Sequence, residues 1–256
     1  MAEITGASNR LIPHEPGLAA GGTLPRDKRF AEPSLLRRLL LLIEMLGLFM
    51  GLPLALKYAV MSQSVPLFVV LQPALLAFVV FLVLDPTFHL RRELIRLPSF
   101  TELVSMLVIF VIAGGMVAAF VAQEMPARFL NFPLQRPETW ERIMILYPLL
   151  SVPVQELVYR TFFFHRYGPL FGTERGALIL TNGVLFGFAH VLFGNWVAIA
   201  GTMVVGTLIA YRYEATRSFW AVWLEHTLWG WLVFTVGLGH YFFTGISNFS
   251  IVRWGF

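Results

Sequence analysis

Several ionisable side chains of this chain stand inside long apolar stretches of sequence. Glu156 and Arg160 share one such stretch, and His190 and His226 stand in two others. A charged side chain near the centre of a membrane helix costs about 2.5–3.5 kcal/mol on insertion scales, so such residues usually face an interior cavity and mark a functional site. A glutamate and two histidines in one cavity can transfer protons to and from water, and they also resemble the ligand set of a zinc protease.

Helical spacing places some of these residues on common faces. Glu156 and Arg160 are four residues apart, so they share a helix face and can form an ion pair. Gln155 precedes Glu156, and adjacent helix positions differ by about 100° in direction, so both side chains cannot point squarely into one cavity. The same four-residue spacing defines one face of another expected helix, formed by Asn182, Phe186 and His190.

The composition indicates a membrane environment for these residues. Of 256 residues, 57% are hydrophobic and only 13% are charged, whereas soluble domains carry about 25% charged residues. The chain has no cysteine, which excludes disulfides, thiol nucleophiles and thiolate metal sites. The net charge of +4 is spread around the apolar stretches, so we expect membrane lipid as a partner and no nucleic acid.

The fold class expected from these stretches is an all-α, polytopic bundle of about seven transmembrane helices, with six to eight as the range. A transmembrane helix needs about 20 apolar residues. A Gly/Pro-rich tail over residues 1–33 is expected to be disordered and cytoplasmic, and residues 34–256 to form the transmembrane domain. The expected spans are 35–59, 65–84, 103–122, 143–164, 177–193, 196–211 and 219–238.

The distribution of positive charge predicts the orientation of the bundle, because Lys and Arg near span ends stay on the cytoplasmic side. The tail, its first flank and every second loop are rich in arginine, whereas the long loop before residue 143 balances its arginines with glutamates. Seven spans then place the N-terminus in the cytoplasm and the C-terminus outside. We expect an integral protein of the bacterial inner membrane.

The polar residues also resemble a known family. The runs Gln155-Glu156-x-x-x-Arg160 and Phe186-x-x-x-His190, followed by His226, are similar to the motifs of the CAAX-protease and bacteriocin-processing family of intramembrane proteases. That family, which includes the Ras-converting endopeptidase, carries Glu-Glu-x-x-x-Arg, Phe-x-x-x-His and His-x-x-x-Asn on successive membrane helices. The resemblance covers about residues 143–238, and three ordered motifs on separate spans are more specific than any one alone.

The resemblance implies a glutamic-type endopeptidase that acts on a membrane-anchored protein or peptide through activated water, without a covalent intermediate. Glu156 and His190 are then expected to activate the water and His226 to stabilise the oxyanion. The expected supporting residues are Arg160, Gln155, Phe186 and Asn182. We expect no cofactor; zinc is not favoured, because the chain lacks the His-Glu-x-x-His pairing that places two ligands on one helix.

Two departures from the family motifs leave alternatives open. Gln155 stands where the family has its first glutamate, and Gly230 stands where it has asparagine. Either Glu156 acts as the base in a variant site, or Glu156 only pairs with Arg160 and the chain is a catalytically silent membrane scaffold or immunity factor. A proton-coupled transporter is a third, less favoured hypothesis, because the sequence lacks the paired, similar halves that many transporters show.

Overall fold

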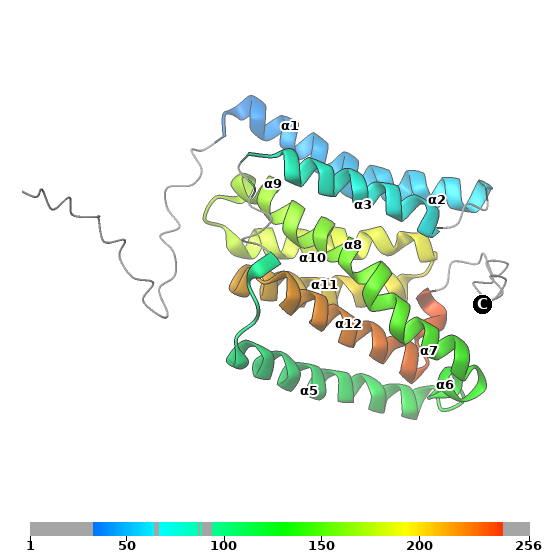
Figure 1. Cartoon of the computed structure of the whole chain (residues 1–256). Coiled ribbons are helices and arrows are strands. Elements are labelled where there is room, and N and C mark those ends of the chain that lie inside the picture. Colours follow the sequence, from blue (N-terminus) through cyan, green and yellow to red (C-terminus); the bar gives the residue numbers. More distant parts are fainter. Residues whose placement is uncertain (1–32, 64–66, 87, 89–93, 243–256) are drawn as a thin grey trace, which may run out of the picture. The chain divides into compact units, whose positions relative to one another are not determined.

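The computed structural model describes residues 33–242 except for 64–66, 87 and 89–93 (Figure 1). The described residues form helices and no β-strand, which confirms the all-α class. The tail expected over residues 1–33 lies outside the described residues apart from Pro33.

The helical segments coincide with the seven apolar stretches expected from the sequence, and several stretches are built from segments joined end to end. In chain order the segments are α1 (Leu35–Leu46), η1 (Gly47–Gly51), α2 (Leu52–Gln63), α3 (Leu67–Leu84), α5 (Phe100–Glu124), α6 (Asn131–Gln135), α7 (Pro137–Leu146), η2 (Tyr147–Ser151), α8 (Val152–Glu156), η3 (Leu157–Phe162), α9 (Phe163–Phe171), α10 (Arg175–Ala189), η4 (His190–Phe193), α11 (Trp196–Thr216), α12 (Phe219–Val236) and η5 (Gly239–Phe242).

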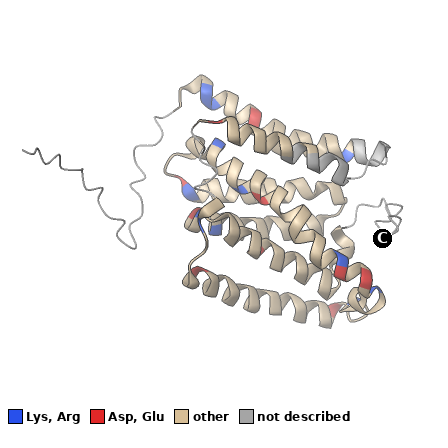
Figure 2. Cartoon of the chain, in the orientation of Figure 1, with Lys and Arg blue, Asp and Glu red and all other residues tan. Residues whose placement is uncertain are grey.

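Among the described residues, four helices are long and apolar enough to cross a membrane: Leu35–Tyr58, Phe100–Glu124, Arg175–Phe193 and Trp196–Thr216. They confirm a helical membrane bundle, whereas the count of seven spans remains a prediction. Figure 2 shows that most charged positions gather near helix ends, with long uncharged stretches between them. Large apolar side chains such as Val111 and Met116 are exposed on α5, as expected of a face in contact with lipid.

The helices that carry the candidate site lie between two outer layers. Figure 1 shows α1, α2 and α3 at one edge of the bundle and α5 at the opposite edge, beside α12. Helices α10 and α11 form the most extensive helix pair, and α11 also packs against α12. The segments η2, α8 and η3 contact α12 as well, so polar residues of α8, α10 and α12 can meet in the interior.

The α10–α11 pair is close because glycines face the contact. A Cβ atom added at Gly183 would lie 2.7 Å from the backbone N and Cα of Thr207, and one at Gly187 would lie 2.8 Å from the backbone oxygen of Ile199. Small residues four apart allow membrane helices to approach backbone to backbone. This approach fixes Phe186, which lies between the two glycines, against α11.

The rod 137–171 departs from regular α-helix on both sides of α8. Segments η2 and η3 are π-helical turns, and such turns often occur at functional sites. Pro148 and Pro153 contribute to the irregularity because proline has no backbone N–H to donate to the helical ladder. The indole of Trp223 on α12 donates to the Pro148 carbonyl oxygen at 2.7 Å. This bond holds the irregular rod against α12, and it gives the Pro148 carbonyl a hydrogen-bond partner that is not water.

Two capping side chains fix where the last helices begin. Asn195 accepts a hydrogen bond from the Ala198 N–H at 2.9 Å and donates to the Tyr241 carbonyl at 2.7 Å. It therefore caps α11 and also holds η5. Ser218 caps α12 by accepting from the Ala221 N–H at 3.2 Å. Both are favoured N-cap residues, because their side-chain oxygens satisfy N–H groups that have no partner within the helix.

Candidate active site

The centre of the candidate site is a hydrogen bond between α8 and α12. The Glu156 Oε1 atom lies 2.7 Å from the His226 Nδ1 atom. The Glu156 side chain is fully buried, and only 7% of the His226 side chain is exposed. A carboxylate that accepts from Nδ1–H fixes the imidazole tautomer and leaves Nε2 unprotonated. This bond orients His226 in the way that a buried carboxylate orients histidine in hydrolases.

The second carboxylate oxygen of Glu156 faces Arg160. Its Oε2 atom lies 3.4 Å from the Arg160 Nε atom, so the expected ion pair four residues apart is present. Neither of these two buried atoms has a hydrogen-bond partner among the described residues. Glu156 is thus bonded to His226 on one side and neutralised by Arg160 on the other.

The Arg160 guanidinium is fully buried and joins three helices. It donates to Asn182 Oδ1 of α10 at 2.5 Å and to the Gly206 carbonyl of α11 at 3.2 Å. Its central carbon lies 4.9 Å from the centre of the Phe186 ring, within the range of a cation–π contact. Asn182 in turn donates to the Tyr159 carbonyl at 2.6 Å. Three of the expected supporting residues therefore form one connected group around Glu156.

His190 begins η4, directly after α10. Its Nδ1 atom lies 2.8 Å from the Phe186 carbonyl oxygen. A carbonyl can only accept, so Nδ1 carries the proton and Nε2 is available as an acceptor. The ring of Phe186 contacts both imidazoles, with centroid distances of 4.9 Å to His190 and 5.5 Å to His226. Phe186 therefore packs against both histidines.

The structure shows a direct partner for Glu156 that helical spacing did not predict. The Glu156 carboxylate bonds to His226, and the expectation that Glu156 and His190 hold one water molecule between them stays a prediction. Gln155 belongs to the site less closely than expected, because its amide donates to the Ser151 hydroxyl at 2.9 Å on its own rod. Within the described part of the chain, Gln155 contacts neither histidine through a hydrogen bond.

One further buried ion pair lies beside the site and was not among the expected site residues. Arg212 of α11 binds Glu225 of α12 through two hydrogen bonds, of 2.8 and 3.2 Å, and also donates to Ser105 of α5 at 3.0 Å. Glu225 is fully buried. Because Glu225 adjoins His226, this ion pair fixes the part of α12 that presents the imidazole. Arg212 lies near the end of its apolar stretch, where arginine is typical of a cytoplasmic flank.

The polar residues of the site do not form a preorganised metal centre. Across the described ranges, no three His, Asp or Glu side chains are grouped so that they could hold a metal ion. The two Nε2 atoms are the available imidazole ligands, and the Glu156 carboxylate is engaged by His226 and Arg160.

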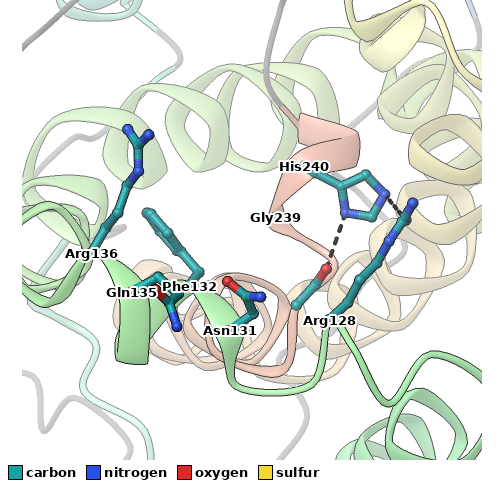
Figure 3. Close-up of a pocket in the computed structure, with 8 residues that line it drawn as sticks. Arg128, Asn131, Phe132, Gln135, Arg136, Gly239 and His240 are labelled. Atoms are coloured by element: carbon teal, nitrogen blue, oxygen red, sulfur yellow. Dashed lines mark hydrogen bonds between the residues drawn. The ribbon is translucent and has the colours of Figure 1, made fainter.

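A separate cavity of about 360 Å³ lies beside η5, and part of its lining is basic (Figure 3). Arg128 and Arg136 line it together with His240. Loss of hydration and the nearby Arg128 lower the pKa of His240 despite a hydrogen bond to the Gly237 carbonyl, so the ring is a neutral acceptor for Arg128. Phe242, two residues further along η5, contacts His190 at a centroid distance of 6.3 Å; η5 thus borders both the cavity and the site.

One comparison with known proteins gives a match. Residues 137–232 match the model of the family described as Rce1-like, type II CAAX prenyl endopeptidase. No curated protein and no solved structure matches the chain. The matched segment begins at α7 and ends within α12, so it contains every residue of the Glu156, Arg160 and histidine group. The match confirms the resemblance found in the sequence motifs.

Proposed function

We propose that this chain is an active intramembrane endopeptidase, as supported by the match of residues 137–232 to the Rce1-like family, type II CAAX prenyl endopeptidase. The observation that carries the proposal is the 2.7 Å bond between Glu156 and His226. A silent scaffold has no need of a buried carboxylate that sets the tautomer of a histidine. The same bond is what a hydrolase requires of a general base.

In the proposed reaction, His226 is the general base and Glu156 is its orienting carboxylate. The His226 Nε2 atom takes a proton from water as the water oxygen forms a bond with the scissile carbonyl carbon. The carbonyl oxygen becomes an oxyanion. When the C–N bond breaks, the proton on Nε2 passes to the leaving amine, and the new carboxyl group retains the water oxygen. Glu156 takes no proton in any of these steps and keeps its contact with Arg160 at 3.4 Å.

His190 has a positioning role in this proposal. Its Nε2 atom is an acceptor because Nδ1 is committed to the Phe186 carbonyl. It can therefore accept the second hydrogen of the attacking water and hold the water beside His226. This arrangement retains the expectation that His190 binds the nucleophilic water and moves the proton transfer from Glu156 to His226.

We propose that the reaction needs no metal ion. The Glu156 carboxylate is occupied by His226 and Arg160 rather than open to a cation. Two imidazole nitrogens alone fall short of the three protein ligands that catalytic zinc sites use. The expected result is a cleavage rate that is unchanged by EDTA or 1,10-phenanthroline; loss of activity that added zinc restores would contradict the metal-free mechanism.

The family description names a prenylated CAAX sequence as the substrate class, and we propose a membrane-associated peptide of this class for the present chain. A prenyl chain adds membrane affinity and would present the peptide beside the lipid-facing helices. We also propose the orientation expected from the charges, with the N-terminus in the cytoplasm of a bacterial cell.

The experiment that tests the function is cleavage of a farnesylated peptide ending in Cys-a-a-X by the purified full-length chain in proteoliposomes. The expected products, identified by mass spectrometry, are the farnesyl-cysteine peptide and the free tripeptide. The peptide without farnesyl is the substrate control. Absence of cleavage of both peptides by a folded protein would contradict the proposal and favour the scaffold hypothesis.

A further inference from the structure

The position where the family motif has asparagine is occupied by an aromatic side chain from another segment. Gly230 lies one turn after His226 on α12. A Cβ atom added at Gly230 would overlap the ring of Tyr147 and lie 2.8 Å from its hydroxyl oxygen. Tyr147 begins η2 on the neighbouring rod. A side chain at position 230 would therefore clash with the Tyr147 ring, and glycine leaves room for that ring.

The Tyr147 ring belongs to the same group of contacts as the proposed base. Its centroid lies 5.9 Å from that of His226 in an edge-to-face arrangement, and a second contact at 5.7 Å holds it against Phe234. The π-helical turn of η2 and the Trp223 bond to Pro148 fix the backbone that follows Tyr147. The hydroxyl group is thus carried on a ring that is packed from two sides.

The two histidines and Gln155 leave no N–H free to donate to an oxyanion, and the Arg160 Nε–H faces the Glu156 carboxylate instead. Both imidazoles use their Nδ1–H groups in bonds to Glu156 and to the Phe186 carbonyl, which leaves two Nε2 acceptors. The Gln155 amide donates to Ser151. In the described residues, the Tyr147 hydroxyl forms no hydrogen bond with another side chain or the backbone. A hydroxyl can donate one hydrogen bond, so Tyr147 can supply the donor that the two histidines and Gln155 do not.

We propose that Tyr147 is a catalytic residue whose hydroxyl donates a hydrogen bond to the oxyanion, in place of the asparagine that Gly230 replaces. The proposal rests on the proposed endopeptidase function. As the water oxygen bonds to the scissile carbon, the carbonyl oxygen gains negative charge and accepts from the Tyr147 O–H. The tyrosine keeps its proton, and the charge disperses when the C–N bond breaks.

The test is the Tyr147→Phe variant, which keeps the ring against Gly230 and removes only the hydroxyl. Removal of one oxyanion donor lowers kcat by about 10²–10³-fold, and KM should stay unchanged because the bond forms in the transition state. The assay uses the farnesylated Cys-a-a-X peptide and the full chain in proteoliposomes. Tyr159→Phe is the matched control, because it removes a hydroxyl from another partly buried tyrosine of the same rod and should retain the wild-type kcat.

A second variant tests whether the donor can be moved back to α12. Tyr147→Ala empties the space beside residue 230, and Gly230→Asn places the asparagine of the family motif there. The double variant should have a kcat at least about tenfold higher than that of Tyr147→Ala alone, since a single such donor accounts for about 10²-fold or more. Unchanged thermal unfolding midpoints show that each variant is folded.

Three outcomes are decisive. A large kcat loss in Tyr147→Phe with an active Tyr159→Phe supports the inference. A Tyr147→Phe variant as active as the wild type, beside an inactive Glu156→Gln variant, would overturn the role of Tyr147 and leave the endopeptidase intact. A wild-type protein that cleaves nothing would overturn the proposed function and this inference with it.

Discussion

Glu156→Gln should lower kcat for the farnesylated peptide by about 10⁴-fold, the loss seen when the orienting carboxylate of a catalytic histidine becomes an amide. The glutamine amide can present an N–H to His226 and so favour the tautomer with its proton on Nε2. That tautomer cannot accept a proton from water. Steady-state cleavage in proteoliposomes measures the loss, and circular dichroism with gel filtration verifies the fold.

The neighbouring position provides the control for this prediction. Gln155→Ala should retain most of the activity, because the Gln155 amide is bonded to Ser151 rather than to a histidine. The pair of variants separates the two interpretations that the family motifs leave open. If Gln155→Ala were inactive and Glu156→Gln active, the Glu156–His226 mechanism would be wrong.

Arg160→Met should lower the free energy of unfolding by about 3–5 kcal/mol, as expected when one partner of a buried ion pair is removed. The variant leaves the Glu156 charge without its cation. It also removes the donors to Asn182 and to the Gly206 carbonyl, which join η3 to α10 and α11. The measurement is unfolding by SDS in mixed micelles, followed by far-ultraviolet circular dichroism.

Two further variants show whether burial of charge is the cause. Arg166→Met removes an arginine from the same rod whose ion pair with Glu44 is about one-third exposed; it should cost no more than about 1 kcal/mol. Arg160→Met combined with Glu156→Gln should regain part of the lost stability, because no unpaired charge remains. Equal losses of stability for Arg160→Met and Arg166→Met would contradict the conclusion that the buried charge of Arg160 stabilises the bundle.

Helical spacing predicted much of the site because it depends on short distances along one chain segment. The Glu156–Arg160 pair follows from four-residue spacing and is present at 3.4 Å. The shared face of Asn182 and Phe186 is likewise present, and Arg160 contacts both residues. These predictions held because residues four apart on a helix face the same neighbour.

The choice of partners across helices could not be read from spacing. Glu156 bonds to His226 on α12, and the π-helical turns on both sides of α8 change the direction of side chains relative to a regular helix. Arg212 stands near the end of an apolar stretch, where a flanking charge is typical, and it binds Glu225 across the α11–α12 turn. Such pairings depend on how helices pack, which the order of motifs does not specify.

Tyr147 was missed for a related reason. A tyrosine near the start of a membrane span resembles an interfacial anchor, and its contact with Gly230 joins two distant parts of the chain. The sequence motif shows that asparagine is absent at position 230. Only the packing of the helices shows that the Tyr147 side chain occupies the space beside that position.

The most direct test of the central claim is the tautomer of His226 in the full chain. The chain has six histidines, so nitrogen NMR of ¹⁵N-histidine-labelled protein in lipid nanodiscs can assign His226 by comparison with His226→Gln. We predict that at pH 8 the proton is on Nδ1, with Nε2 unprotonated, and that Glu156→Gln abolishes this state. A proton on Nε2 and a bare Nδ1 in the wild-type protein would contradict the account.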